Sequence, residues 1–156
     1  MNAQISETTD LLARITRNIS RIEELATGTN ALQGHTELAS LLAGFAQTAP
    51  LPMWIKNRDG QMIWMNDAYL SWYGVNLDRY IGHRDSAEWS CDTAASFDEN
   101  DQRVLDTGRP LVAVEQLWNK KYNETESLQV IKFPLIVENE GHVCVAGLGL
   151  GFIRGI

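Results

Sequence analysis

The sequence predicts an α+β fold: a five-stranded antiparallel sheet with short helices and an N-terminal helical extension. Two observations carry this prediction. Residues 51–74 read as strand, tight turn, strand and helix, and residues 111–152 contain three further strand-like segments. Helical patterns lie between these two groups and before the first of them.

The first hairpin is predicted from two strand-like runs, residues 53–56 and 61–65, on either side of a polar turn. Asp59-Gly60 is a strong hairpin signal, because glycine accepts a positive φ without a Cβ clash. Asn66 follows the second strand and is expected to cap the helix that begins after it. Gly74 is expected to end that helix.

Residues 1–48 are interpreted as a helical extension that carries a dimerisation seam. Apolar residues recur with heptad spacing from Ile5 to Ala26, as at the a and d positions of a coiled coil. Two interpretations remain open: the seam pairs with a second copy, or the helix lies on its own domain. The dimer-interface candidates are Leu12, Ile15, Ile19 and Ile22.

Further helices are predicted along the chain. One covers Thr36–Gln47 after a break at residues 31–34, and short helical turns are expected in Leu77–Asp85. A longer helix is predicted over Asp92–Asp106. Its acidic run, Asp98-Glu99-Asn100-Asp101, is expected to face solvent or to break the helix.

The remaining strands are predicted over Leu111–Trp118, Ser127–Phe133 and His142–Phe152. The polar segment Asn119–Glu126 is expected to be a long, mobile loop. Glycines alternate with apolar residues in the last strand, at positions 147, 149 and 151. Glycines on one face allow a helix or a ligand to approach closely.

Three motifs resemble those of a PAS domain, over about residues 50–152. Lys56–Asn66 is similar to the family's first hairpin, "Lys-Asp-x-x-Gly-x-Ile-x-x-x-Asn". Asp106–Pro110 resembles the "x-Thr-Gly-x-Pro" turn, and Lys132–Leu135 with Glu140–Val143 resembles "Lys-x-Pro-Leu … x-Gly-x-Val". The resemblance implies a PAS domain at residues 49–156, with strand order 2-1-5-4-3 and the short helices on one face.

The resemblance also implies a sensory module of a signal-transduction or transcription-regulatory protein. Such a module would bind a small molecule between sheet and helices and signal through a homodimer; the alternative is a ligand-free dimerisation or protein-interaction scaffold. Lys132 has two interpretations, an ion pair with a carboxylate such as Glu115 or an anion-binding group at the pocket edge. The ligand-pocket candidates are Trp54, Met65, Tyr69, Trp72, Trp89, Lys132 and Leu148.

No cofactor, metal or catalytic residue is expected. The segment that ends at Cys91 lacks the asparagine and arginine that flank the cysteine of flavin-binding light-oxygen-voltage domains, and Cys91 is expected to be a buried, inert thiol. The predicted helix Asp92–Asp106 contains no histidine for haem. The sequence also lacks hydrolase, zinc and phosphate-loop motifs, so an enzyme is not expected.

Composition limits the partners. The formal net charge of −7 is expected to disfavour direct binding to nucleic acid. No apolar run reaches the roughly 18 residues of a membrane span. Two separate cysteines without an export signal favour a cytoplasmic location.

Overall fold

The computed structural model of the chain describes residues 31–137 and 142–153. The seam candidates Leu12, Ile15, Ile19 and Ile22 lie outside the described residues. The chain divides into two units between Phe45 and Ala46, and the sheet belongs entirely to the second unit. The domain boundary expected at residues 48 and 49 stays a prediction.

Helix α2 spans Ala31–Thr48, so the break expected at residues 31–34 was wrong. Gly34 lies within this helix. A glycine in a helix interior costs only about 1 kcal/mol relative to alanine, so a helix of this length tolerates it. None of the helices in the described part of the chain is both long and apolar enough to cross a membrane.

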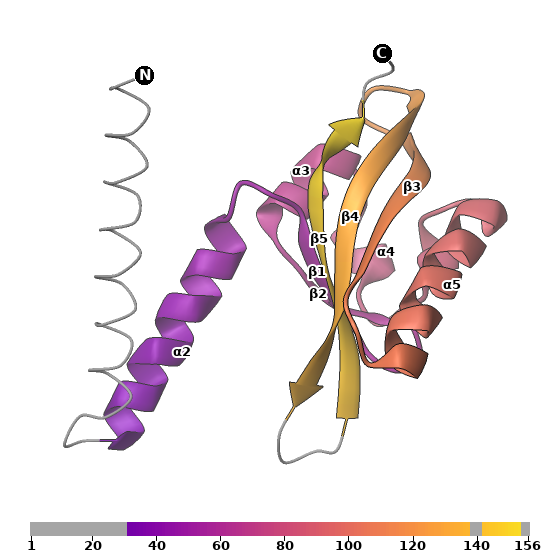
Figure 1. Cartoon of the computed structure of the whole chain (residues 1–156). Coiled ribbons are helices and arrows are strands. Elements are labelled where there is room, and N and C mark those ends of the chain that lie inside the picture. The colour runs from indigo at the N-terminus through magenta and orange to yellow at the C-terminus, as the bar shows by residue number, and fades with distance from the viewer. Residues whose placement is uncertain (1–30, 138–141, 154–156) are drawn as a thin grey trace, which may run out of the picture. The chain divides into compact units, whose positions relative to one another are not determined.

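The sheet has five strands in the order β2-β1-β5-β4-β3, and all neighbouring strands are antiparallel (Figure 1). This confirms the expected fold and strand order. The short helices pack on the face of the sheet that carries the core. The strands are β1 (Met53–Lys56), β2 (Met62–Met65), β3 (Leu111–Asn119), β4 (Glu124–Val137) and β5 (His142–Ile153).

The first hairpin and its helix form as local chemistry predicts. Gly60 in the turn has φ +76°, a conformation that suits glycine. Asn66 caps helix α3 (Asp67–Tyr73) by accepting from the Tyr69 N–H at 3.0 Å. Its amide also donates to the carbonyl of Leu51 at 2.9 Å, so this fully buried side chain ties α3 to the segment before β1. Gly74 ends α3 with φ +65°.

Three more helices follow α3: α4 (Leu77–Tyr80), the 3-10 helix η1 (Asp85–Ala87) and α5 (Cys91–Thr107). Helix α5 runs unbroken through its acidic segment, and Asp101 is buried, so the expectation of solvent exposure or a break was wrong for this residue. Cys91 is exposed, and the expected buried thiol was also wrong. It is the first residue of α5, just after the N-cap Ser90, and not part of the core face.

The connection between β3 and β4 is shorter than predicted. Strand pairing continues to Asn119 opposite Glu124, which leaves residues 120–123 as the turn. Asn123 takes a left-handed conformation, with φ 56°, and its N–H donates to the Asn119 carbonyl at 2.8 Å. The long loop expected over Asn119–Glu126 was therefore wrong, because its polar residues pair as strand ends.

The alternating glycines of β5 admit protein side chains. A Cβ on Gly147 would lie 2.2 Å from the ring of Trp54, which crosses over this position from β1. A Cβ on Gly149 would lie 3.1 Å from the Tyr73 hydroxyl and 3.3 Å from Pro52. The close approach expected at these glycines thus comes from an aromatic ring of β1, a tyrosine of α3 and a proline.

We expect Gly147→Ala to destabilise the domain by about 1–3 kcal/mol, because the added methyl group forces the buried Trp54 ring to move. Denaturant unfolding followed by tryptophan fluorescence measures the change. Gly44→Ala is the matched control: a Cβ there meets nothing within 4 Å, and alanine is the better helix former. Equal stability of Gly147→Ala and wild type would contradict the packing described here.

Candidate functional site

A nearly filled chamber lies between the sheet and helices α3 and α5. Its free volume is about 10 Å³, the room of one water molecule. Most of the lining is aromatic or aliphatic, but three charged side chains also reach it. The lining residues are Trp54, Lys56, Tyr69, Tyr73, Trp89, Phe97, Glu115, Leu117, Leu128 and Lys132.

Lys56 is the first centre of a buried charge network. It alternates with Trp54 along β1, so both side chains point to the core face. Its Nζ binds a carboxylate oxygen of Asp85 at the start of η1 and lies 2.7 Å from Asp101 Oδ2 on α5. Burial alone lowers the pKa of this ammonium, but the two carboxylates outweigh burial and raise it above its ordinary value.

Lys132 on β4 is the second centre and is 1% exposed. Its Nζ lies 2.7 Å from Asp101 Oδ1 and 2.7 Å from Glu115 Oε1 on the neighbouring strand β3. It also donates to the backbone carbonyl of Phe97 at 3.2 Å. Of the two interpretations of Lys132, the ion pair with Glu115 is present. Asp101 thus lies between two lysines on β1 and β4.

Tyr80 extends the network into the aromatic part of the core. Its hydroxyl donates to Asp85 Oδ1 and accepts from the Trp89 indole N–H at 3.0 Å. The Tyr69 hydroxyl lies 3.4 Å away. Burial, and then the negative charge of Asp85, raises the pKa of Tyr80 above its ordinary value, so this group stays a neutral donor.

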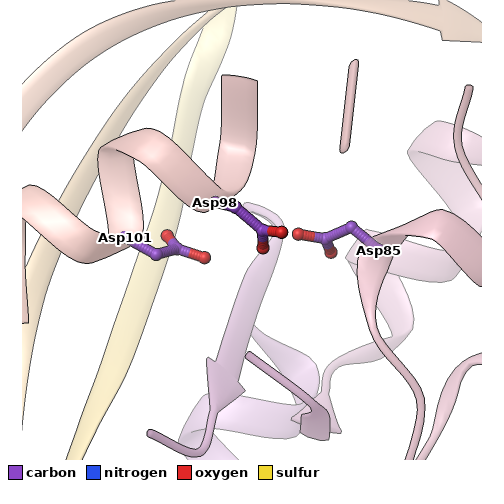
Figure 2. A group of neighbouring side chains, drawn as sticks. All are labelled: Asp85, Asp98 and Asp101. Carbon is purple, nitrogen blue, oxygen red and sulfur yellow. The ribbon is translucent and has the colours of Figure 1, made fainter. Parts of the chain in front are cut away.

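A third aspartate faces the same cluster from α5. Figure 2 shows the carboxyl groups of Asp85, Asp98 and Asp101 directed into one space, and their nearest oxygen atoms lie within 4.8 Å of one another. Burial and the neighbouring Asp85 raise the pKa of Asp98. Carboxylates so grouped suit a cation. However, the Lys56 ammonium already binds Asp85 and Asp101. The protein's own lysine is therefore the cation that these two carboxylates bind.

Tyr73 also lines the chamber. The side chain is 2% exposed, and its oxygen has no hydrogen-bond partner among the described residues. Burial raises the pKa of this phenol well above its ordinary value. Tyr73 is therefore a neutral polar group whose hydrogen-bonding capacity remains unused by the described protein atoms.

The structure brings some of the predicted pocket residues to the chamber. Trp54, Tyr69, Trp89 and Lys132 line it. Met65 is buried in the core cluster but does not reach the cavity. Trp72 is half-buried and stacks on Phe152 outside the chamber, and Leu148 follows the chamber-facing Gly147 on β5 and so points to the other face of the sheet.

Sequence reasoning missed several members of the site: Lys56, Asp85, Asp101, Tyr80 and Tyr73. A signal existed for two of them. Lys56 shares the strand face of Trp54, and Asp101 follows Phe97 by one helical turn on the apolar face of α5. A charge on an apolar face indicates either a buried ion pair or a functional group.

Comparison with known proteins matches this architecture. The family model of the PAS fold covers residues 47–143, which is more than half of the chain. The chain belongs to the PAS family. A PAS-domain structure from Colwellia psychrerythraea shares 12% identity with it over 72% of this chain and 94% of that chain, with a TM-score of 0.60. Comparison with curated proteins gave no match.

Two further solved structures contain a domain with the same fold. The PAS domain of Bordetella pertussis BvgS has 18% identity and a TM-score of 0.58, with coverage of 77% of this chain and 88% of that chain. VqmA bound to DPO has 16% identity and a TM-score of 0.63, with coverage of 73% of this chain and 57% of that chain. This PAS chain therefore matches just over half of the VqmA chain, and at these identities the likeness is one of fold.

Two buried tyrosines, Tyr80 of the charge network and Tyr73 of the chamber wall, give a paired prediction. We expect Tyr80→Phe to destabilise the PAS domain by about 2–3 kcal/mol, because it removes a hydrogen bond to the buried carboxylate of Asp85. Tyr73→Phe removes a hydroxyl without a partner among the described residues, and stability should be unchanged or higher. Chemical denaturation of both variants measures the difference, and equal losses in the two would contradict the network.

Proposed function

We propose that this PAS domain is the sensory module of a signal-transduction or transcription-regulatory protein, binding a small molecule in the chamber and signalling through a dimer interface. The observation that carries the proposal is the charge on the chamber wall, from Lys56, Lys132 and Glu115. Apolar residues often replace a buried ion pair without loss of stability. Charges in a largely aromatic pocket are the groups that orient a small ligand.

Tyr73 supports the same proposal. A buried hydroxyl without a partner costs stability, and such a cost is offset when a ligand supplies the missing hydrogen bond. Tyr73, Lys132 and Glu115 all line one space. They suit a small, polar ligand that carries hydrogen-bonding groups and an apolar part for the aromatic rings.

The free volume of about 10 Å³ means that such a ligand binds only when chamber side chains move. A ligand anion that takes over Lys132 would release Asp101 or Glu115 from it, and Asp101 is on α5. Ligand binding would then shift the population towards a conformation in which α5 is held differently. This change at α5 is the signal that occupancy of the chamber would produce in the domain.

The structural neighbours support this proposal by analogy of fold. The VqmA structure named above has DPO bound, and a second structure describes a Vibrio cholerae VqmA dimer. We propose a homodimer through the N-terminal helices, at Leu12, Ile15, Ile19 and Ile22, for this chain. We also propose a cytoplasmic protein that makes no direct contact with nucleic acid, consistent with the net charge of −7.

One observation favours a second candidate, a ligand-free dimerisation or protein-interaction scaffold. The chamber is nearly filled by its own side chains, as in a hydrophobic core that binds no ligand.

In either case we propose that the domain is not an enzyme. The buried carboxylates of Asp85, Asp101 and Glu115 are engaged by lysines, which supports a structural or sensory role.

A ligand screen tests the sensory proposal. We expect native mass spectrometry to find a copurified compound, or a metabolite panel in a thermal-shift assay to raise the melting temperature. A ligand at 100 times its Kd stabilises the folded state by about 2.7 kcal/mol. Tyr73→Phe should weaken binding of that compound by about 2- to 13-fold, the loss of one hydrogen bond. If neither assay finds a ligand, the scaffold is correct and the sensory proposal is not.

The dimer has its own test. We expect Ile15→Asp to shift the size-exclusion profile from dimer to monomer, because it places a charge in the apolar seam. Ala13→Asp adds the same charge two residues away, at a heptad position outside the seam, and should remain dimeric. A profile of Ile15→Asp that equals the wild-type profile would rule out this seam.

A further inference from the structure

A second concave site lies outside the chamber. It is a groove of about 350 Å³ between α3, the β3–β4 turn and the end of β5. This volume falls within the range of small-molecule sites, whereas the chamber leaves far less room. Three aromatic side chains and two carboxylates face it: Trp72, Tyr122, Phe152, Glu124 and Glu126.

One buried asparagine holds the lining residues of this groove together by hydrogen bonds. The side chain of Asn119 is fully buried, and its Nδ2 donates to the Trp72 carbonyl on α3 at 3.0 Å and to a carboxylate oxygen of Glu126. Its Oδ1 accepts from the backbone N–H groups of Lys121 at 2.9 Å and Tyr122 at 3.4 Å. Asn119 therefore touches four of the residues that line the groove and fixes them before any ligand arrives.

The aromatic side chains of the groove also make contacts of their own. The rings of Trp72 and Phe152 stack with centroids 5.4 Å apart and an angle of 30° between their planes. Tyr122 is exposed, and its ring lies under the ammonium group of Lys121, with Nζ 5.1 Å from the centroid. A cation thus already occupies a position over an aromatic face of this groove.

The geometry points to a binding site for a small organic cation, such as an alkylammonium or quaternary ammonium compound. Aromatic faces attract such cations, and the carboxylates of Glu124 and Glu126 complement their charge. The formal charge of the groove is −1 with Lys121 included, and −2 when a ligand displaces the Lys121 ammonium from Tyr122. Binding in this groove does not require a ligand in the chamber.

The test is a titration of ¹⁵N-labelled protein with choline, monitored by NMR. We expect saturable shifts of the Trp72 indole resonance and of the backbone amides of residues 121–126. The control ligand is 3,3-dimethyl-1-butanol, which has the shape of choline without the charge. It should bind more weakly by about 2- to 30-fold, the range of a cation–π contribution.

Two variants should change the affinity for choline in opposite directions, which distinguishes an effect on binding from damage to the fold. Lys121→Met removes the competing ammonium and should tighten choline binding by about 2- to 5-fold, whereas Glu124→Gln should weaken it by a similar factor. Glu99→Gln removes the same charge from the exposed face of α5 and should leave binding unchanged. Equal binding of the neutral analogue, the absence of saturable shifts, or weaker binding by Lys121→Met would overturn the proposal.

Discussion

The carboxylate of Asp101 holds two ammonium groups at once, and much of the domain depends on that arrangement. Lys56 is on β1 and Lys132 is on β4, with β5 between these strands in the sheet. Removing one member of a buried ion pair leaves the other charge buried and unpaired, at a typical cost of about 3–5 kcal/mol. The positions of α5 and of the strands on both sides of β5 are therefore mutually dependent, and Asp85 adds η1 to the same group.

Features that depend on neighbours in sequence could be predicted. Asn66 caps a helix by accepting from Tyr69, three residues away, and Gly60 and Gly74 adopt positive φ where a turn and a helix end require it. The strand order could be predicted only through the resemblance of spaced motifs, because no local rule pairs β1 with β5. Gly34 shows the limit of local signals, since α2 continues through it.

Most of the charge network could not be predicted, because its partners are distant in sequence. The ion pair of Lys132 with Glu115, on neighbouring strands, was one of the two interpretations of that lysine. Asp101 and Lys56 are 45 residues apart, and Lys56 and Asp85 are 29 apart. An acidic run reads as solvated unless a partner is known, and the partner lies on another element. Among the pocket candidates, Leu148 was misplaced relative to the chamber for a simpler reason: the side chains of a strand alternate, and its neighbour Gly147 takes the inner face.

The double hold on Asp101 has a mechanical consequence for α5. Phe97 lies one turn before Asp101 and packs against Trp89 with ring centroids 5.8 Å apart, so it stands at the chamber wall. Lys132 also holds the backbone carbonyl of Phe97 at 3.2 Å, so one ammonium group contacts two successive turns of α5. A displacement of Phe97 would therefore be passed through Lys132 to β4, and the helix and the sheet would move together.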